Sequence, residues 1–115
     1  MMNPFWSDIR RLLGPYIYGT DVGSLQQAVV NELTARGQRI ATAESCTGGL
    51  ISKCLTDIAG SSQVFAGGIC AYTNDVKTAL LGVQPETLAH YTAVSEQTAR
   101  EMAKALVGFC TLIMP

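Results

Sequence analysis

The amino-acid sequence predicts an α/β fold in which helices are layered on a central sheet. Segments with apolar residues at helical spacing alternate with short apolar segments rich in β-branched and aromatic residues, the order typical of α/β domains. A hydrophobic fraction of 48% beside a charged fraction of 15% indicates a chain that buries a core. The length of 115 residues fits one domain and leaves no room for a second full core.

The N-terminal part predicts a lead segment followed by a helix. Residues 1–22 begin with aromatic side chains and turn signals, and we interpret them as a linker or the remnant of a preceding domain, with a short extended piece at Tyr16–Tyr18. Ser24 begins a helix that ends at Gly37, because Ser24 and Gln27 have the spacing of a capping box. Four apolar residues form one stripe of this helix: Leu25, Ala28, Val29 and Leu33.

The middle of the chain predicts a strand, a tight turn, a helix and a second strand. Arg39–Glu44 is short and follows a helix-ending glycine, which favours a strand. Apolar positions after Ser45 recur at helical spacing, namely Leu50, Ile51, Cys54, Leu55 and Ile58. Val64–Thr73 is an apolar run typical of a buried strand, and Gly67 with Gly68 inside it indicates a bulge or a close approach of another backbone.

The C-terminal part predicts three more helices and a strand. Asn74–Leu81 forms a short helix capped by its first residue, and Pro85 suits the first turn of a helix over Pro85–Tyr91. Ser95 caps a third helix, whose apolar face consists of Ala99, Met102, Ala103, Leu106 and Val107. The apolar tail Phe109–Met114 predicts a third strand.

Charge and cysteine usage exclude several classes of function. A formal net charge of -1, from eight basic and nine acidic residues, gives no electrostatic footprint for nucleic acid or an anionic membrane surface, so a small-molecule ligand is favoured. The sequence has no secretory h-region, and we expect a cytoplasmic protein. The cysteines lack metal-ligand spacing, so we expect no metal and four reduced, mostly buried thiols: Cys46, Cys54, Cys70 and Cys110.

Ser45 lies where the first predicted strand turns into a helix. This geometry exposes a side chain at the sheet edge and directs the following backbone N–H groups at one point, where an oxyanion or a phosphate can bind. Gly48 and Gly49 allow the backbone to approach a ligand closely. The simpler alternative is that Ser45 or Thr47 only caps the helix.

Tyr72 and Lys77 are candidate partners of that serine. Tyr72 ends the second predicted strand, and Lys77 falls on the first turn of the next helix, where the helix dipole disfavours an ammonium group. Serine with lysine, or with tyrosine and lysine, can perform acyl transfer without histidine. The alternative is an exposed Lys77 and a packed Tyr72.

Three other side chains have two interpretations each. Cys46 is a rival nucleophile because a helix N-terminus activates a thiol, although a buried packing role is the simpler expectation. Glu44 is a candidate acid, base or ligand-binding group, or else a solvated carboxylate near the helix start. His90, the only histidine, is expected on the surface.

Four motifs, AESCTGG, DIAGSS, AYTNDVK and AVSE, follow one another within residues 24–106. In this order and spacing they resemble the CinA C-terminal domain family, the nicotinamide mononucleotide deamidases. The resemblance implies hydrolysis of the carboxamide of nicotinamide mononucleotide to nicotinic acid mononucleotide and ammonia, with no cofactor and no metal. It also implies a small-molecule nucleotide as the partner, and we expect a homo-oligomer.

Carried over motif by motif, the resemblance makes Ser45 the nucleophile, with Tyr72 and Lys77 activating it and relaying protons. Backbone N–H groups of the loop after Ser45 would hold the tetrahedral oxyanion or the nucleotide. The substrate-binding residues implied in this way are Glu44, Cys46, Thr47, Gly48, Gly49 and Asn74.

The sequence departs from the family pattern at its C-terminus. The family continues into further strands and a TGIAGP-type glycine-rich loop, whereas this sequence reads GFCTLIMP, so residues 23–115 match the N-terminal half to two-thirds of the domain. A catalytically inactive nucleotide-binding or self-associating fragment is therefore the alternative function. A dinucleotide-binding module of the Rossmann type is a weaker alternative because GxGxxG is absent.

Overall fold

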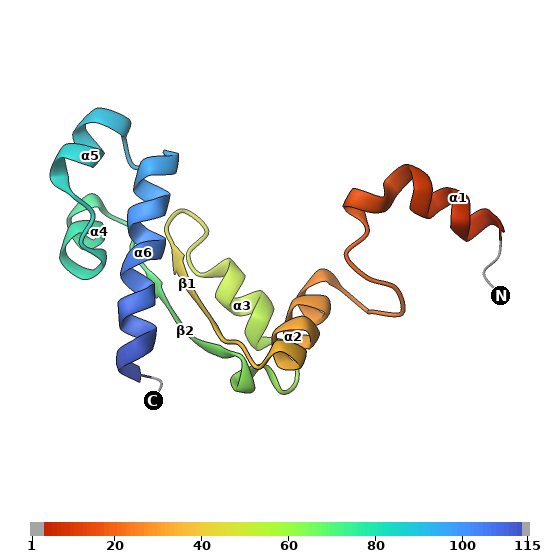
Figure 1. Ribbon diagram of the computed structural model, residues 1–115. Coiled ribbons are helices and arrows are strands. Elements are labelled where there is room, and N and C mark those ends of the chain that lie inside the picture. The colour runs from red at the N-terminus through yellow and green to blue at the C-terminus, as the bar shows by residue number, and fades with distance from the viewer. Residues whose placement is uncertain (1–3, 114–115) are drawn as a thin grey trace.

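The computed structural model describes the backbone of residues 4–113 and the side chains of residues 4–108, and it confirms the predicted α/β class (Figure 1). Helices surround a small parallel sheet. In chain order the elements are α1 (Pro4–Leu13), η1 (Gly14–Tyr16), α2 (Leu25–Arg36), β1 (Ile40–Glu44), α3 (Leu50–Thr56), η2 (Ser61–Gln63), β2 (Phe65–Cys70), α4 (Asn74–Leu81), α5 (Pro85–Tyr91) and α6 (Glu96–Ile113).

β1 and β2 pair in parallel, with α3 as the crossover between them. The register shifts between Ile40, which lies opposite Phe65, and Ala41, which lies opposite Gly67. A Cβ atom at Gly68 would lie 2.3 Å from Thr42 Oγ1. The bulge thus lies at Ala66, directly before the predicted glycine pair, and the close approach at Gly68 involves side-chain hydroxyls as well as the Thr42 backbone.

Two apolar clusters lie on opposite sides of the sheet, where Figure 1 shows α6 on one side and α3 on the other. α6 covers one face, where the buried cluster consists of Ala71, Leu81, Val83, Met102 and Leu106. α3 covers the other face, and α2 packs on α3 around Val30, Leu55 and Val64. Side chains alternate along β1, so Ala41 and Ala43 contact the α6 cluster, whereas Thr42 and Glu44 bond to α3.

The predicted signals for α2 are confirmed at both ends. The Ser24 hydroxyl accepts a hydrogen bond from the Gln27 N–H at 3.1 Å, and Gly37 ends the helix with φ 63°. The predicted apolar stripe is wrong at Leu25, which is 53% exposed, while Val30 is buried in the cluster. Val29 and Leu33 of the predicted stripe do pack against this cluster.

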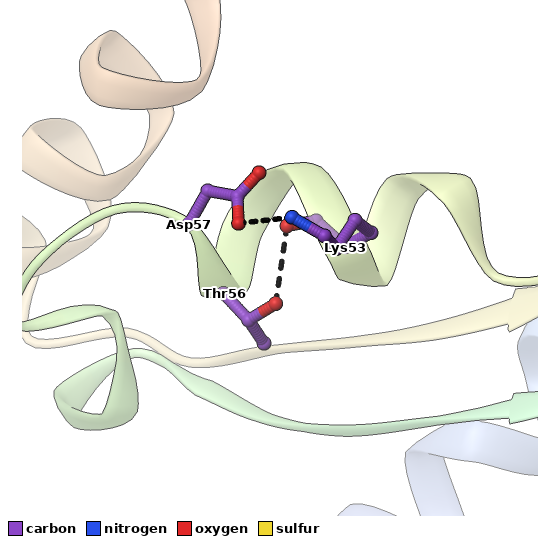
Figure 2. Close-up of polar contacts among 3 residues, drawn as sticks. All are labelled: Lys53, Thr56 and Asp57. Carbon is purple, nitrogen blue, oxygen red and sulfur yellow. Dashed lines mark hydrogen bonds and ion pairs between the residues drawn. The ribbon is translucent and has the colours of Figure 1, made fainter.

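α3 ends in a short polar arrangement (Figure 2). The Thr56 hydroxyl donates to the Lys53 carbonyl oxygen at 3.0 Å, and the Lys53 ammonium pairs with the Asp57 carboxylate. Both partners of the ion pair are exposed, so it contributes only about 0.3–0.5 kcal/mol. This end of α3 is the one far from Ser45, whose loop precedes the other end of the helix.

The lead segment differs from its prediction. Residues 4–16 form α1 and then η1, so the predicted extended piece Tyr16–Tyr18 is wrong at Tyr16, whereas Ile17 is extended with φ -88° and ψ 109°. The apolar residues of α1 recur at helical spacing, namely Phe5, Trp6, Ile9, Leu12 and Leu13, and none of them is buried. α1 stands away from the body of the molecule (Figure 1), which gives principal extents of 56 × 33 × 21 Å. The helical spacing of these residues is a helix signal in the sequence, which the interpretation of residues 1–22 as a linker left unused.

The predicted C-terminal strand is also wrong, because α6 continues to Ile113, the last residue before the undescribed Met114. A growing helix gains one hydrogen bond for each residue that it adds, whereas a strand needs a neighbour to pair with. Within the described residues, none of the helices combines the length and the apolar character needed to cross a membrane.

Two capping predictions have different outcomes. Ser95 caps α6 through a bond from the Thr98 N–H at 3.2 Å, as predicted. α4, however, is capped by Thr73, whose hydroxyl accepts from the Val76 N–H, and not by Asn74.

α5 spans Pro85–Tyr91 as predicted. On α6, Met102 and Leu106 of the predicted apolar face are buried, whereas the other three residues are exposed: Ala99, Ala103 and Val107.

Candidate active site

The two strands end at one edge of the sheet, and two candidate residues leave them there. Glu44 is paired with Cys70, and the Ala71 N–H donates to the Glu44 carbonyl oxygen at 2.8 Å. Ser45 follows Glu44 and Tyr72 follows Ala71. The two residues therefore emerge side by side from the carboxyl ends of adjacent parallel strands, where α/β folds commonly bind ligands.

Ser45 lines a cavity of about 380 Å³ between β1 and α6. Ala41 and Ala43 extend the wall along the strand, while Val94 and Met102 close the other side. Ser45 takes its place on this face because it is the next odd-numbered residue after Ala43, and alternate residues of a strand face the same way. The cavity is mostly apolar, with one hydroxyl at its sheet edge.

The Glu44 carboxylate is buried on the opposite face, at 4% exposure. Oε1 accepts from the Thr47 hydroxyl at 2.9 Å and from the Ile51 N–H at 2.7 Å. Oε2 accepts from the N–H of Ser52 at 3.1 Å and from its hydroxyl at 2.7 Å. Burial raises the pKa of Glu44, but these four hydrogen bonds lower it by more, so the pKa lies below its ordinary value of 4.5. The alternative of a solvated carboxylate is wrong.

Glu44 also caps the first turn of α3. Its carboxylate accepts from the N–H groups of Ile51 and Ser52 in the first turn of α3, which is the role of a capping group. The expected cap by Ser45 or Thr47 is therefore wrong. Gly49 precedes the helix with φ 101°, a backbone conformation that favours glycine. The Gly48 N–H donates to the Ser45 carbonyl oxygen at 3.1 Å and closes a turn there.

The alternative of an exposed Lys77 and a packed Tyr72 is wrong for both residues. Lys77 is 1% exposed, and its amine donates to the Tyr72 carbonyl oxygen at 2.9 Å. Tyr72 is 70% exposed. Lys77 belongs to α4, whose Val76 and Leu81 pack into the α6 cluster. The amine thus lies beside the end of β2, while neither Lys77 nor Tyr72 is among the residues that line the Ser45 cavity.

The other candidates divide between the site and the surface. Cys46 is exposed and lines the Ser45 cavity, so its expected burial is wrong and it remains a rival nucleophile. Cys70 is also exposed and Cys54 is half-buried, so the expectation of mostly buried thiols is wrong for these residues; the Cys110 side chain lies outside the described residues. His90 is exposed as expected, with Nδ1 at 3.1 Å from the Glu86 carbonyl oxygen.

Thr47 and Gly48 are exposed in the loop after Ser45, and Gly49 is half-buried behind them. Asn74 is exposed at the start of α4 and lines a separate groove of about 360 Å³ beside α5. Of the predicted binding residues, Cys46 therefore shares the cavity wall with Ser45, whereas Asn74 lies in another depression and Glu44 bonds to α3.

A protein-family model described as the CinA C-terminal domain matches residues 22–111 of the chain. This match covers well over half of the sequence. The chain belongs to the CinA C-terminal domain family. The resemblance seen in the four sequence motifs is confirmed.

Curated relatives of this family agree with the match. A CinA-like protein of Kosmotoga olearia is 50% identical over 106 residues, which are 92% of this chain and 26% of that protein. A putative competence-damage inducible protein of Symbiobacterium thermophilum is 48% identical over 101 residues, 88% of this chain and 24% of that protein. The chain thus spans about a quarter of the length of the curated relatives it matches.

Solved CinA structures share the fold. The competence/damage inducible protein CihA of Agrobacterium tumefaciens has a TM-score of 0.73 and 45% identity, covering 81% of this chain and 56% of that one. A competence-damaged protein (CinA) superfamily member of Escherichia coli has a TM-score of 0.75 and 30% identity, covering 96% of this chain and 62% of that one.

Sequence reasoning missed several residues of this CinA C-terminal domain site. Val94 and Met102 line the cavity, and Ser52 supports Glu44 from α3. The helical stripe of α6 gave a signal for Met102, although it indicated only core packing. Ser52 is eight residues from Glu44, and no local spacing rule relates a strand-ending carboxylate to a helix hydroxyl at that distance.

Proposed function

We propose that this chain hydrolyses the carboxamide of nicotinamide mononucleotide, giving nicotinic acid mononucleotide and ammonia. The observation that carries the proposal is the pairing of an apolar cavity edged by Ser45 with a buried amine, Lys77, held at the end of the adjacent strand. Membership of the CinA C-terminal domain family supports the proposal, and the roles of the residues come from the resemblance of the sequence motifs.

In the proposed reaction the Ser45 hydroxyl is the nucleophile. Its oxygen attacks the carboxamide carbon while its proton passes to the Lys77 amine, directly or through the Tyr72 phenol. The carbonyl oxygen becomes an oxyanion, which backbone N–H groups of the Cys46–Gly49 loop stabilise. The intermediate then collapses, the C–N bond breaks, and the proton held by lysine leaves with ammonia. Water attacks the resulting ester and releases the carboxylate and the serine.

The cavity supports this substrate class through its shape and polarity. Its walls are mostly apolar side chains, suited to a flat aromatic ring such as nicotinamide, with Ser45 at the sheet edge and Ser95 at the start of α6 as its hydroxyl groups. A carboxamide entering ring-first toward Met102 would keep its reacting carbon near the strand end. The exposed loop of Cys46 to Gly48 then faces the ribose and the phosphate.

The proposed mechanism requires the exposed Tyr72 side chain to rotate. With 70% of the residue accessible, the phenol must turn toward the bound carboxamide to relay a proton. Such a rotation about the side chain needs no backbone movement, because exposed side chains change rotamer on a picosecond to nanosecond timescale.

The test is ammonia release from nicotinamide mononucleotide by the purified chain. Ser45→Ala should abolish turnover, and Lys77→Met should lower kcat by about 10²–10⁴-fold, the usual contribution of a general base. Methionine is similar in length to the buried lysine side chain. The unfolding temperature of Lys77→Met therefore shows whether a loss of activity comes from lost chemistry or from lost folding. Glu32→Gln, at an exposed ion pair on α2, is the matched control and should retain full activity. Turnover that persists in both site variants would refute the assigned roles.

A catalytically inactive nucleotide-binding or self-associating chain is the second candidate. Two observations favour it: within the described residues each strand has one edge without a strand partner, and the apolar residues of α1 are exposed. Titration calorimetry with nicotinamide mononucleotide, beside sedimentation velocity, distinguishes the candidates. Saturable binding without ammonia release would select this function, and a concentration-dependent mass would select self-association.

A further inference from the structure

We infer that a buried hydrogen-bond network on the α3 face of the sheet fixes the position of Ser45 on the opposite face. The network consists of the Glu44 carboxylate, the hydroxyls of Thr42, Thr47 and Ser52, and the N–H groups of Ile51 and Ser52. The inference rests on the proposed function, and it assigns Glu44 a positioning role in place of the substrate-binding role that the family resemblance implied.

One carboxylate ties together both ends of the loop that carries the nucleophile. Glu44 precedes Ser45 directly, Thr47 lies within the loop, and Ile51 and Ser52 follow it on α3. The distances from Glu44 oxygens to these three residues range from 2.7 to 3.1 Å. The loop therefore cannot shift relative to β1 or α3 without breaking a charged hydrogen bond, the stronger class of such bonds.

A second contact anchors the carboxylate to the sheet. The Ser52 hydroxyl lies 2.7 Å from Glu44 Oε2 and 2.7 Å from Thr42 Oγ1, so it bridges Glu44 to the residue two positions earlier on the same strand. The glycine beneath these hydroxyls leaves them room, since a Cβ atom at Gly68 would lie 2.3 Å from Thr42 Oγ1 and 2.6 Å from Ser52 Oγ.

The carboxylate is too well satisfied to serve as a ligand-binding group. Both oxygens already accept two hydrogen bonds each, and the residue is 4% exposed. Its contacts all lie on the α3 side, whereas the Ser45 cavity is bounded by β1 and α6. Glu44 thus acts through the backbone that it shares with Ser45 and does not touch the substrate.

The decisive variant is Glu44→Gln, which keeps the shape of the side chain but replaces one acceptor oxygen by a donor group. The Ser52 or Ile51 N–H then loses its acceptor, and the loop shifts. Because misplacing a reacting group by about 1 Å can cost about 100-fold in rate, we expect kcat for ammonia release to fall by about 100-fold with KM within about threefold of the starting protein. Glu32→Gln, at an exposed carboxylate, should change neither value.

A kcat for Glu44→Gln within about threefold of the starting protein, in a variant that remains folded, would overturn the positioning role. If Glu44→Gln fails to fold, Ser52→Ala takes its place, because it removes one hydroxyl and keeps the carboxylate. Its expected loss in kcat is about tenfold, the effect of one hydrogen bond, and an unchanged kcat would likewise overturn the inference.

A third measurement separates this inference from the proposed function. Cys46 is exposed and follows Ser45, so its alkylation rate with iodoacetamide, located by peptide mass spectrometry, reports the loop geometry without turnover. If the starting protein releases no ammonia, the proposed function fails, and the alkylation rate decides the positioning role. A change of about fivefold or more in Glu44→Gln supports it, and a rate equal to that of Glu32→Gln overturns it.

Discussion

Replacing Gly68 by alanine tests the packing on which the loop depends. The added Cβ atom would lie 2.3 Å from Thr42 Oγ1, 2.6 Å from Ser52 Oγ and 3.3 Å from the Thr42 carbonyl oxygen. A hydroxyl can rotate away, but the bond between Thr42 and Ser52 is then lost and the carbonyl contact remains tight. Overpacking of this kind costs about 1–3 kcal/mol, and one lost hydrogen bond costs about 1 kcal/mol.

Alanine also restricts the unfolded chain, which offsets about 0.4–1 kcal/mol of that cost. The net destabilisation is therefore about 1–3.6 kcal/mol. At about 4 °C per kcal/mol for a chain of this size, the unfolding temperature should fall by about 4–14 °C. Circular dichroism during heating measures this fall directly, and urea unfolding gives the free energy independently.

The matched control is Gly23→Ala, because no atom lies within 4 Å of a Cβ atom built at that position. Gly23→Ala should leave the unfolding temperature unchanged or slightly raised. An equal unfolding temperature for Gly68→Ala and Gly23→Ala would refute the close approach between β2 and the hydroxyls of Thr42 and Ser52.

Three further predictions concern stability. Because the folded-state pKa of Glu44 is depressed, its contribution is present above about pH 4.5 and is lost as pH falls through the folded-state value; thermal unfolding from about pH 7 to about pH 3 should show a loss that Glu44→Gln flattens. Gly108→Ala, in α6 with no atom near its Cβ, should raise the unfolding free energy by about 0.5–1 kcal/mol in urea, and a decrease would contradict a helical residue 108. Thr98→Val removes the buried hydroxyl that donates to the Thr92 carbonyl oxygen at 2.8 Å, so calorimetry should show a loss of about 1–3 kcal/mol, whereas an unchanged value would place that carbonyl in contact with water.

Local signals in the sequence predicted most of the elements. The Ser24 cap, Gly37 and Pro85 act on their own backbone, so residues a few positions apart are enough to reveal a helix end. α1 was missed although its apolar residues recur at helical spacing, because the turn signals of residues 14–19 favoured a linker. The C-terminal strand was predicted from β-branched and aromatic residues, yet α6 continued as a helix past Gly108. At the C-terminus the continuation of the preceding helix, and not the strand preference of the last residues, decided the outcome.

The candidate site illustrates the same limit more sharply. The turn after β1 and its serine were predicted from the strand, turn and helix order. The burial of Lys77 and Glu44 was not, since both depend on contacts that only the folded chain creates: α4 packing against α6, and α3 returning over β1. Charged residues are usually exposed, and an exposed lysine or carboxylate was the simpler alternative for each.

Neighbouring residues 44 and 45 face opposite sides of one strand, and this has a consequence for protein engineering. Substitutions on the α6 wall, at Ala99 or Ala103 for example, can reshape the space available to a guest molecule while the anchoring carboxylate and its hydroxyl partners stay intact on the far side. Ligand preference and loop rigidity are thus adjustable by separate sets of mutations, a modularity that comes directly from the two-residue period of a β-strand.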